Sequence, residues 1–473
     1  MPNPDRQLSG TFISESLADE IVETNLLSAI AVKKAVIDSR EIMQGDLFVA
    51  MRGTKHNGHA FVEEAIKRGA AAILIDEESS KPQQHSFILV RDSLTALQRL
   101  GSEWRKQITA KVLAITGSVG KTTTKNIAGE IFSNYENTSW NRKNYNNEIS
   151  VPLCLLETPA SSNLAIIEMG MYEIGEIDFL CKVAKPDIGI VLNVGPTHLS
   201  RAGSLENIQL AKSELPRSLP ENGHSILNFD DALVWQMRQV AKSNILGFSA
   251  AGNIKADVTA TDIEVASDGR VVFNIRYKSE NTRFSIELSG THLVENVVAV
   301  ISSGIAMGYT TEQISQTMEN MIFSDRIVRT DIPGGITILN DTYNSQPKSL
   351  EAALRVLDSS AGSRIALLGD MLELGSVSKA EHIAAGIHAA STVDHLVTIG
   401  YESRVLAQTA KEYGLKSVEM VNSNQEAIDA LLEIIDFGDT VLIKGSHSLK
   451  LDEVASALIS KLKSRSHKKD KTL

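Results

Sequence analysis

Residues 111–124 read Lys-Val-Leu-Ala-Ile-Thr-Gly-Ser-Val-Gly-Lys-Thr-Thr-Thr, and this stretch decides how the middle of the chain folds. An apolar run typical of a strand leads into a glycine turn, and Lys121 and Thr122 then open a helical pattern. In such a loop the backbone N–H groups point at phosphate oxygens, the lysine reaches the β- and γ-phosphates, and the threonine hydroxyl ligates Mg²⁺. The stretch therefore predicts a triphosphate site.

The loop matches a shortened form of the phosphate-binding pattern. The full pattern G-x-x-x-x-G-K-[ST] has its first glycine where this chain has Ile115, so that G-x-x-G-K-T remains. A short pattern of this kind can occur by chance, but the strand pattern before it and the helical pattern of residues 126–132 favour phosphate binding. The residues predicted to contact the nucleotide are Gly117, Ser118, Val119, Gly120, Lys121, Thr122 and Thr123.

The composition of the 473 residues is that of a globular protein of about three domains. Hydrophobic residues make up 42% and charged residues 22%, and the net charge of −11 argues against general nucleic-acid binding, which needs a basic surface. Two cysteines, Cys154 and Cys181, fit neither a disulfide framework nor a zinc or redox spacing. The start shows no secretory pattern and no apolar run approaches about 18 residues, so we expect a cytoplasmic protein without a membrane span.

Strand and helix patterns alternate along the chain, which predicts an α/β fold of three domains. Residues 1–108 read as a small α/β domain. Residues 109–323 read as a mostly parallel sheet that carries the phosphate-binding loop and an antiparallel appendage at 257–289. Residues 324–473 read as a Rossmann-like α/β domain, in which no G-x-G-x-x-G follows a strand, so a dinucleotide is not implied. The strands are expected at residues 46–50, 71–75, 86–90, 112–116, 164–168, 188–193, 225–228, 336–339, 365–368, 395–399 and 440–443.

Polar residues follow two of the strands expected beside the loop. Glu168 ends an apolar run, where an acidic Mg²⁺ ligand would stand opposite the loop. His198 lies in a glycine-proline turn after the next strand. Ligands bind at the carboxyl ends of the strands of open parallel sheets, so both are candidate site residues, although a strand-end Glu and a loop His are also common on plain surfaces.

An asparagine-rich segment, residues 141–147, is too polar for a core and carries two cations. Its amide groups suit contact with an anionic or amide-bearing substrate, and a solvated loop explains the composition nearly as well. The candidate substrate residues in this segment are Asn144, Asn146 and Asn147.

Motifs in all three expected domains, in order along the chain, make the sequence resemble the Mur ligase family. The first domain carries Asp38-Ser-Arg-Glu-Ile-Met-Gln-Gly-Asp-Leu-Phe-Val-Ala50 and Asn57-Gly-His59. The middle domain carries Gly117-Ser-Val-Gly-Lys-Thr-Thr, Asn144-Tyr-Asn-Asn-Glu-Ile-Ser-Val-Pro-Leu, Ile167-Glu-Met-Gly-Met, Thr197-His-Leu, Ala211-Lys-Ser-Glu and Gly290-Thr-His-Leu-Val-Glu-Asn296. The third carries Asn340-Asp-Thr-Tyr-Asn-Ser-Gln-Pro347, Leu368-Gly-Asp-Met-Leu-Glu-Leu-Gly375 and Lys444-Gly-Ser-His-Ser-Leu449.

The resemblance implies a cytoplasmic ATP-dependent ligase of peptidoglycan precursor synthesis, working through an acyl phosphate. Its first domain would bind a uridine nucleotide and its middle domain ATP with two Mg²⁺ ions. The motifs of the third domain resemble the family members that join D-alanyl-D-alanine to UDP-N-acetylmuramoyl-tripeptide. We expect these two substrates, no nucleic-acid partner and a monomer.

Carried over position by position, the resemblance also implies roles for single residues. Thr122 and Glu168 would hold a first Mg²⁺ and His198 a second, while Lys212 matches the family lysine that can carry a carbamate. Further positions are implied to contact the nucleotide (Asn296, Arg326, Asp341), the uridine substrate (Ser39, Arg40) and the incoming dipeptide (Asn344). The expected catalytic residues are Lys121, His198, Lys212 and Arg326.

The chain departs from the family pattern in places, and alternatives remain open. Asp325 stands where a glycine usually precedes the arginine, Ser345-Gln346 replaces the usual Ala-Asn, and His447 replaces a frequent arginine. The alternatives are a related ligase that adds a single amino acid, such as the third peptide residue, and a phosphate-loop switch protein without ligation. The run from Asp341 to Asn344, and the lack of an Asp-Asn-Pro-Arg motif, favour the dipeptide ligase.

Overall fold

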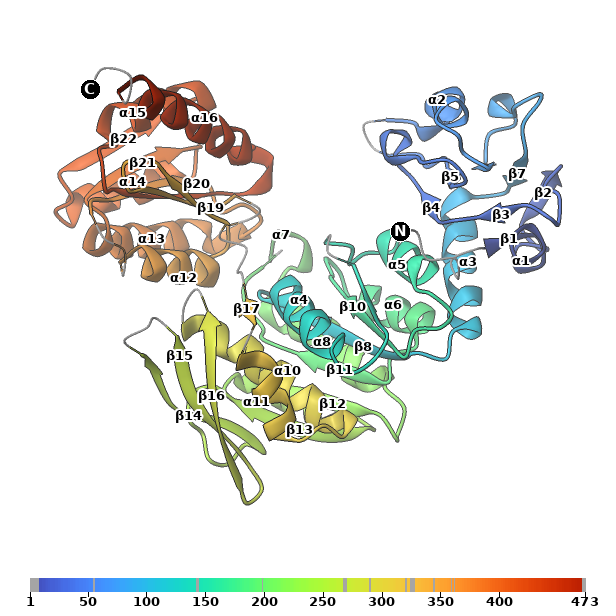
Figure 1. Cartoon of the computed structure of the whole chain (residues 1–473), viewed down its shortest axis with the longest axis horizontal. Coiled ribbons are helices and arrows are strands. Elements are labelled where there is room, and N and C mark those ends of the chain that lie inside the picture. The colour runs from blue at the N-terminus through green and yellow to red at the C-terminus, as the bar shows by residue number, and fades with distance from the viewer. Residues whose placement is uncertain are drawn as a thin grey trace. The chain divides into compact units, whose positions relative to one another are not determined.

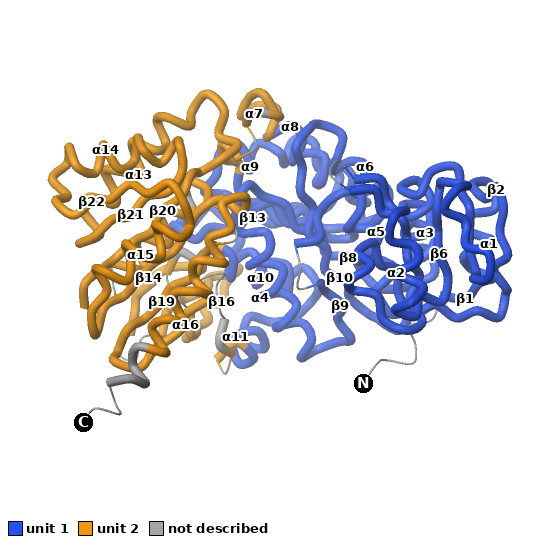
Figure 2. Tube along the Cα trace, turned by 90° about the horizontal axis from the view of Figure 1, so that it is seen from above, with its two compact units in different colours: residues 1–193, 209–259, 296–317 blue, residues 194–208, 260–295, 318–473 orange. Residues whose placement is uncertain are grey.

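The computed structural model describes residues 8–469 except 54–55, 142–143, 198, 267–269, 289–290, 320, 324–327, 343–344, 359 and 361. These residues form two compact units (Figure 2). Unit 1 comprises residues 1–193, 209–259 and 296–317, and unit 2 comprises residues 194–208, 260–295 and 318–473. The secondary structure is mixed α/β with mostly parallel sheets, as the sequence predicts (Figure 1).

The first part of unit 1 is a five-stranded sheet with the order β2-β7-β6-β5-β4. Strands β4 to β7 pair in parallel, and β2 joins the edge antiparallel. The strands are β2 (Ile21–Thr24), β4 (Ala35–Val36), β5 (Leu47–Val49), β6 (Ala72–Ile75) and β7 (Phe87–Val90). Helix α2 (Val62–Lys67) packs its buried residues into this core, and α3 (Ser93–Gln107), whose first turn is capped by Asp92, leads onward. The three strands expected here are confirmed.

The second part of unit 1 is a parallel sheet around the predicted phosphate-binding loop. Its order is β13-β12-β11-β8-β10-β9, so β8 lies between β10 and β11. Its strands are β8 (Lys111–Thr116), β9 (Thr138–Trp140), β10 (Leu164–Glu168), β11 (Ile188–Val191), β12 (His224–Asn228) and β13 (Asn244–Ser249). Its helices include α4 (Lys121–Phe132), α5 (Ser150–Glu157), α6 (Glu176–Ala184), α8 (Leu205–Ser218) and α10 (Val294–Met307). After β8 the chain forms β9 and β10 on one side of β8, and then β11, β12 and β13 on its other side. This change of direction creates a ligand crevice at the carboxyl ends of the strands.

The expected antiparallel appendage is confirmed, and its first strand joins the sheet of the middle part. Strands β15 (Val271–Tyr277) and β16 (Glu280–Leu288) pair antiparallel, but β14 (Val258–Val265) pairs in parallel with β13 through Phe248 and Val258. The segment therefore extends the sheet of the middle part instead of forming a separate one. Helix α11 (Thr311–Glu319) and β17 (Ile322–Phe323) follow it.

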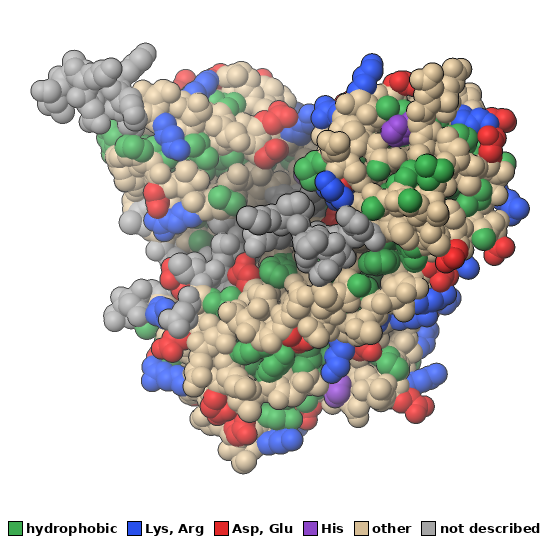
Figure 3. All heavy atoms as spheres, turned by 45° about the vertical axis from the view of Figure 1, so that its right-hand side comes forward, with side chains coloured by type: hydrophobic (Ala, Val, Ile, Leu, Met, Phe, Trp, Pro, Cys, Tyr) green, Lys and Arg blue, Asp and Glu red, His purple; other side chains and the backbone are tan. Residues whose placement is uncertain are grey.

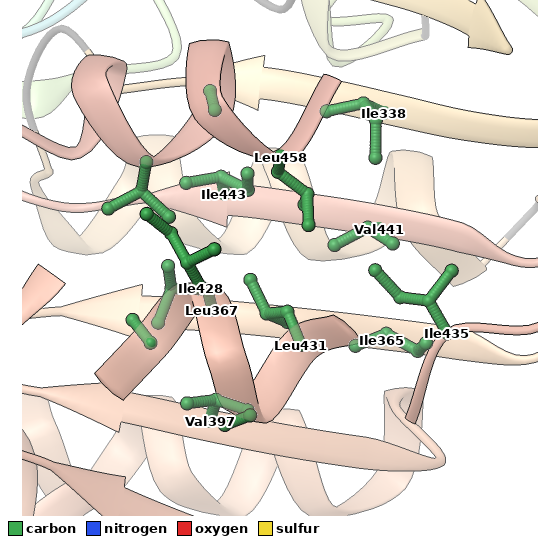
Figure 4. Close-up of a cluster of buried hydrophobic side chains, with 14 of the residues drawn as sticks. Ile338, Ile365, Leu367, Val397, Ile428, Leu431, Ile435, Val441, Ile443 and Leu458 are labelled. Atoms are coloured by element: carbon green, nitrogen blue, oxygen red, sulfur yellow. The ribbon is translucent and has the colours of Figure 1, made fainter. Parts of the chain in front are cut away.

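The last part of unit 2 is a six-stranded sheet with helices on both faces. Its order is β18-β19-β23-β20-β21-β22, parallel except for the edge strand β18. The strands are β18 (Val328–Ile332), β19 (Ile336–Asp341), β20 (Arg364–Gly369), β21 (His395–Ile399), β22 (Ser417–Val421) and β23 (Thr440–Lys444). Helices α15 (Asn424–Ile434) and α16 (Leu451–Lys469) cover one apolar core, part of which Figure 4 shows. Helices α12 (Pro347–Asp358), α13 (Ser378–Thr392) and α14 (Ser403–Glu412) cover the other.

On the face drawn in Figure 3, Lys and Arg side chains are interspersed with Asp and Glu side chains. Within the described part of the chain, every helix is too short or too polar to cross a membrane.

Candidate functional site

The turn between β8 and α4 has the conformation of a phosphate-binding loop. Gly120 caps α4 with a left-handed backbone, φ 86°. A side chain there would be strained, and its Cβ would also lie 2.5 Å from Nδ2 of Asn296. The left-handed backbone therefore favours glycine at this position, and a side chain would in addition displace the Asn296 amide.

Asn193, which follows β11, holds the loop from the side. The backbone N–H of Ser118 donates to the Asn193 carbonyl oxygen at 3.0 Å, and the N–H of Val119 donates to Asn193 Oδ1 at 2.9 Å. Asn193 Nδ2 donates in return to the Val119 carbonyl oxygen at 3.3 Å. The sequence analysis missed Asn193, although an amide directly after an apolar strand at the ligand edge is the signal that could have found it.

Asn296 on α10 supports the loop from behind. Its Nδ2 donates to Thr124 Oγ1 at 2.8 Å and to the Gly120 carbonyl oxygen at 3.3 Å. The residue is buried and fixes the first turn of α4. The structure thus brings Asn296 to the predicted nucleotide site, in contact with the loop itself.

Lys121 folds back over the loop in the structure. Its Nζ donates to the Gly117 carbonyl oxygen at 2.7 Å and to that of Ser118 at 3.3 Å. The ammonium group is thereby held above the turn, where an anionic ligand would meet it.

A cluster of oxygen atoms gathers at the start of α4. Thr122 Oγ1 lies 2.7 Å from Glu168 Oε2 at the end of β10 and 2.8 Å from Asn144 Oδ1. Asn146 Nδ2 donates to the other oxygen of Glu168 at 2.8 Å. The predicted pairing of Thr122 with Glu168 is therefore present, and two residues of the asparagine-rich segment join it.

The oxygen cluster fits a hard divalent cation. The Thr122 hydroxyl has one hydrogen, yet two acceptor oxygens lie within hydrogen-bonding distance of it. Hydroxyl, carboxylate and amide oxygens are the ligands that Mg²⁺ prefers, and a cation satisfies three such atoms where one hydrogen cannot. The residues that would hold the metal are Thr122 and Glu168, with Asn144 beside them.

Glu168 is ionised at its buried position because cations surround it. Burial alone would raise its pKa, but Lys121, Lys125 and the hydrogen bonds from Thr122 and Asn146 outweigh burial and hold the pKa below its ordinary value. Lys125 Nζ lies 3.4 Å from Glu168 Oε2, and only 2% and 1% of the two side chains are exposed. The sequence analysis did not single out Lys125, because its role arises only from this tertiary contact.

Lys212 on α8 is buried, so it is not a solvated lysine on the outer face of the helix. Only 2% of it is exposed. Burial, and repulsion from the nearby Lys121, lower its pKa well below the ordinary value. Two residues later, Glu214 accepts the N–H groups of Gly175 and Asp178 at 2.7 and 2.8 Å and anchors α8 to α6.

Other predicted site residues make contacts outside this oxygen cluster, or lie outside the described residues. Ser39 Oγ donates to Glu64 Oε2 at 3.2 Å, and the exposed Arg40 pairs with Asp38 at 2.6 Å. Asn147 Oδ1 accepts the N–H of Ser150 at 2.9 Å and so holds the start of α5. The remaining predicted residues fall into two groups: Asp341, buried in unit 2, and Thr123, half-buried in α4, are described, whereas His198, Arg326 and Asn344 are not.

Comparison with known proteins finds family models that match three stretches of the chain. Residues 32–105 match the catalytic domain of the Mur ligase family, residues 115–304 the Mur ligase middle domain, and residues 326–447 the Mur ligase glutamate ligase domain. The UDP-N-acetylmuramoyl-tripeptide–D-alanyl-D-alanine ligase of Bacillus subtilis is 32% identical over 455 residues, which cover 94% of this chain and 96% of the relative.

Solved structures of similar fold cover nearly the whole chain. A crystal structure of MurF from Acinetobacter baumannii matches with a TM-score of 0.82 and 28% identity, over 97% of this chain and all of the other. The MurF ligase of Thermotoga maritima in complex with ADP matches with a TM-score of 0.76 and 26% identity, over 91% of this chain and 98% of the other.

Proposed function

The chain belongs to the Mur ligase family, and we propose that it joins D-alanyl-D-alanine to the free carboxylate of UDP-N-acetylmuramoyl-tripeptide with cleavage of ATP to ADP and phosphate. The observation that carries the proposal is the oxygen cluster of Thr122 and Glu168 beside the phosphate-binding loop, in a chain similar over nearly its full length to ligases of this name. The enzyme would work in the cytoplasm as a monomer.

The chemistry explains why an amide-forming enzyme needs this site. A carboxylate is a poor acyl donor because its leaving group would be oxide. In the first step a carboxylate oxygen bonds to the γ-phosphorus while the bond to the β–γ bridging oxygen breaks, which gives an acyl phosphate and ADP. The amine of the dipeptide then attacks the acyl carbon, phosphate leaves, and the nitrogen loses a proton.

The loop residues would neutralise charge in the first step, where a carboxylate meets a triphosphate. The backbone N–H groups of Gly120 to Thr123 at the start of α4 would bind phosphate oxygens, while Asn193 holds those of Ser118 and Val119. Lys121 would stabilise the charge that develops on the transferred group. Mg²⁺ held by Thr122 and Glu168 would add positive charge between the phosphates.

Lys212 and His198 would complete the metal site. A buried amine next to Lys121 is disfavoured as an ammonium ion, and a neutral amine can add CO₂: the nitrogen bonds to carbon, and a proton leaves. The carbamate is anionic and supplies oxygen ligands for a second Mg²⁺. We propose that this carbamylated lysine and His198 hold that ion.

The remaining predicted residues would bind the rest of the ligands. Arg326 and Asp341 would contact the nucleotide together with Asn296, and Ser39 and Arg40 would contact the uridine moiety. The asparagine-rich segment would contact the tripeptide substrate through Asn144, Asn146 and Asn147. Asn344 would contact the dipeptide.

The direct test is product formation. The purified protein is incubated with ATP, Mg²⁺, UDP-N-acetylmuramoyl-tripeptide and D-alanyl-D-alanine, and the pentapeptide nucleotide is detected by mass spectrometry together with stoichiometric ADP. Parallel reactions replace the dipeptide with meso-diaminopimelate or L-lysine. Equal turnover of a single amino acid would move the assignment to another member of the family, and ATP cleavage without any peptide product would contradict ligation.

A further inference from the structure

A second lysine, Lys125, shares the carboxylate that would bind the metal. It lies three residues after Thr122 on α4, so both side chains are on the same face of the helix. Its Nζ is 3.4 Å from Glu168 Oε2, the same oxygen that Thr122 Oγ1 approaches to 2.7 Å. A cation bound between Thr122 and Glu168 would therefore meet an ammonium group at its own ligand.

The Lys125–Glu168 pair is buried, so the charge of each group acts strongly on the other. A carboxylate taken out of water needs a counter-ion, and Lys125 supplies one without any ligand. Lys121 also acts on Glu168, so two ammonium groups face one carboxylate. Both lysines lower the pKa of the Glu168 carboxyl group, and screening by water is weak at such a depth.

We propose that Lys125 is a positioning residue that acts through Glu168, as a built-in counter-ion that keeps divalent cations from binding until a polyphosphate has bound. Its ammonium group competes with a free cation for the Glu168 carboxylate. The several negative charges of a nucleotide reverse the sign of the site, and the metal then binds with the nucleotide. The inference rests on the proposed function only in that Thr122 and Glu168 are taken as the metal ligands.

The test is Mn²⁺ binding by the full-length protein, followed through the electron paramagnetic resonance signal of free Mn²⁺ with and without ADP. Lys125→Met removes the charge, and Lys125→Arg keeps it. Lys111→Met is the matched control, because it also removes one lysine charge. Lys111 is exposed at the amino end of β8, whereas the loop follows the carboxyl end of the same strand.

We expect the wild type to bind Mn²⁺ at this site only when ADP is present. Lys125→Met should bind Mn²⁺ without nucleotide at least about tenfold more tightly than the wild type, whereas Lys125→Arg and Lys111→Met should not. In the double variant Lys125→Met with Glu168→Gln, the tighter Mn²⁺ binding of Lys125→Met should be lost. A merely structural role for Lys125 would lower metal binding, not raise it.

Two results would overturn the proposal. One is a folded Lys125→Met protein, by circular dichroism, that binds Mn²⁺ no more tightly than the wild type. The other, which needs no variant and decides the matter if Lys125→Met does not fold, is a wild type that binds Mn²⁺ equally well with and without ADP. Ligation by the wild type is measured separately, so a missing product would count against the ligase function and not against this inference.

Discussion

Two buried lysine–carboxylate pairs have their carboxylates at the ends of strands in different sheets, and they are built differently. In unit 2, Lys444 and Asp341 lie directly opposite each other on β23 and β19, with Nζ 2.5 Å from Oδ2. In unit 1, Lys125 approaches Glu168 only to 3.4 Å, and Glu168 also meets Thr122 and Asn146. The closer pair joins two neighbouring strands at one position of their ladder. The looser pair shares its carboxylate among several partners, which is what a carboxylate that exchanges partners with a ligand requires.

The largest effect should come from removing the loop cation beside the looser pair. Lys121→Ala should lower the rate of ligation by on the order of 10³-fold or more, because Lys121 acts on charge that develops during phosphoryl transfer. The fold should remain, since the hydrogen bonds of Lys121 Nζ to the Gly117 and Ser118 carbonyl oxygens lie within the loop and outside the apolar core. Steady-state ADP release and circular dichroism check both parts, and near-normal turnover in a folded variant would refute the loop assignment.

The next effect concerns stability and separates the two pairs. Lys444→Met should destabilise unit 2 by about 3–5 kcal/mol, because it removes the ammonium group that lies 2.5 Å from the buried Asp341 carboxylate. Lys125→Met should destabilise unit 1 by less, because Glu168 keeps Lys121, Thr122 and Asn146.

Urea unfolding can assign the loss to one unit. The three tryptophans, Trp104, Trp140 and Trp235, all lie in unit 1, so their fluorescence follows that unit while circular dichroism follows both. Lys444→Met should shift the circular dichroism transition and leave the fluorescence transition in place. If Lys444→Met and Lys125→Met lower the free energy of unfolding by the same amount, the two pairs do not differ in the way that their geometry indicates.

A smaller loss of activity, with a way to reverse it, is expected at Lys212. Lys212→Ala should lower kcat by about 100-fold, because the anionic group proposed on this buried lysine would be missing. Short carboxylic acids such as acetate should restore part of the activity by filling the vacated anionic position. Full activity of Lys212→Ala in CO₂-depleted buffer would exclude a carbamate, and absence of the added 44 Da in the native mass of the wild type would argue the same way.

The comparison of the two pairs also shows what the sequence could and could not predict. The loop, Lys121 and the Thr122–Glu168 pair were predictable because an apolar strand, a glycine turn and a strand-end acid each leave a local pattern. The edge strands β2 and β18 were missed because most of their residues are exposed and give no apolar run. Lys125 was missed because nothing local distinguishes a lysine that a neighbouring strand will bury.

The asparagine-rich segment shows the same limit at the level of single residues. Its composition predicted contact with a ligand, but not which amide does what. Asn144 and Asn146 lie at the oxygen cluster, whereas Asn147 holds the first turn of α5. These roles depend on the direction of each side chain after folding, and spacing alone does not give that direction.

The smallest effect should come from the support of the loop, at Asn193. Asn193→Ala removes one acceptor and one donor for Val119 but keeps the backbone bond to Ser118, so the loop should lose order and not its fold. We expect ADP to bind about tenfold more weakly, as the loss of one or two hydrogen bonds implies.

Asn228 at the end of β12 provides the matched control for Asn193. It is equally buried, and its side chain also makes two hydrogen bonds, to the Leu192 carbonyl oxygen and from the Asp230 N–H, at 2.8 and 2.9 Å. Asn228→Ala should therefore cost similar stability while leaving the dissociation constant for ADP, measured by calorimetry, unchanged. If both variants weaken ADP binding to the same degree, then general loosening of the strand ends accounts for the effect and Asn193 has no specific role in ordering the loop.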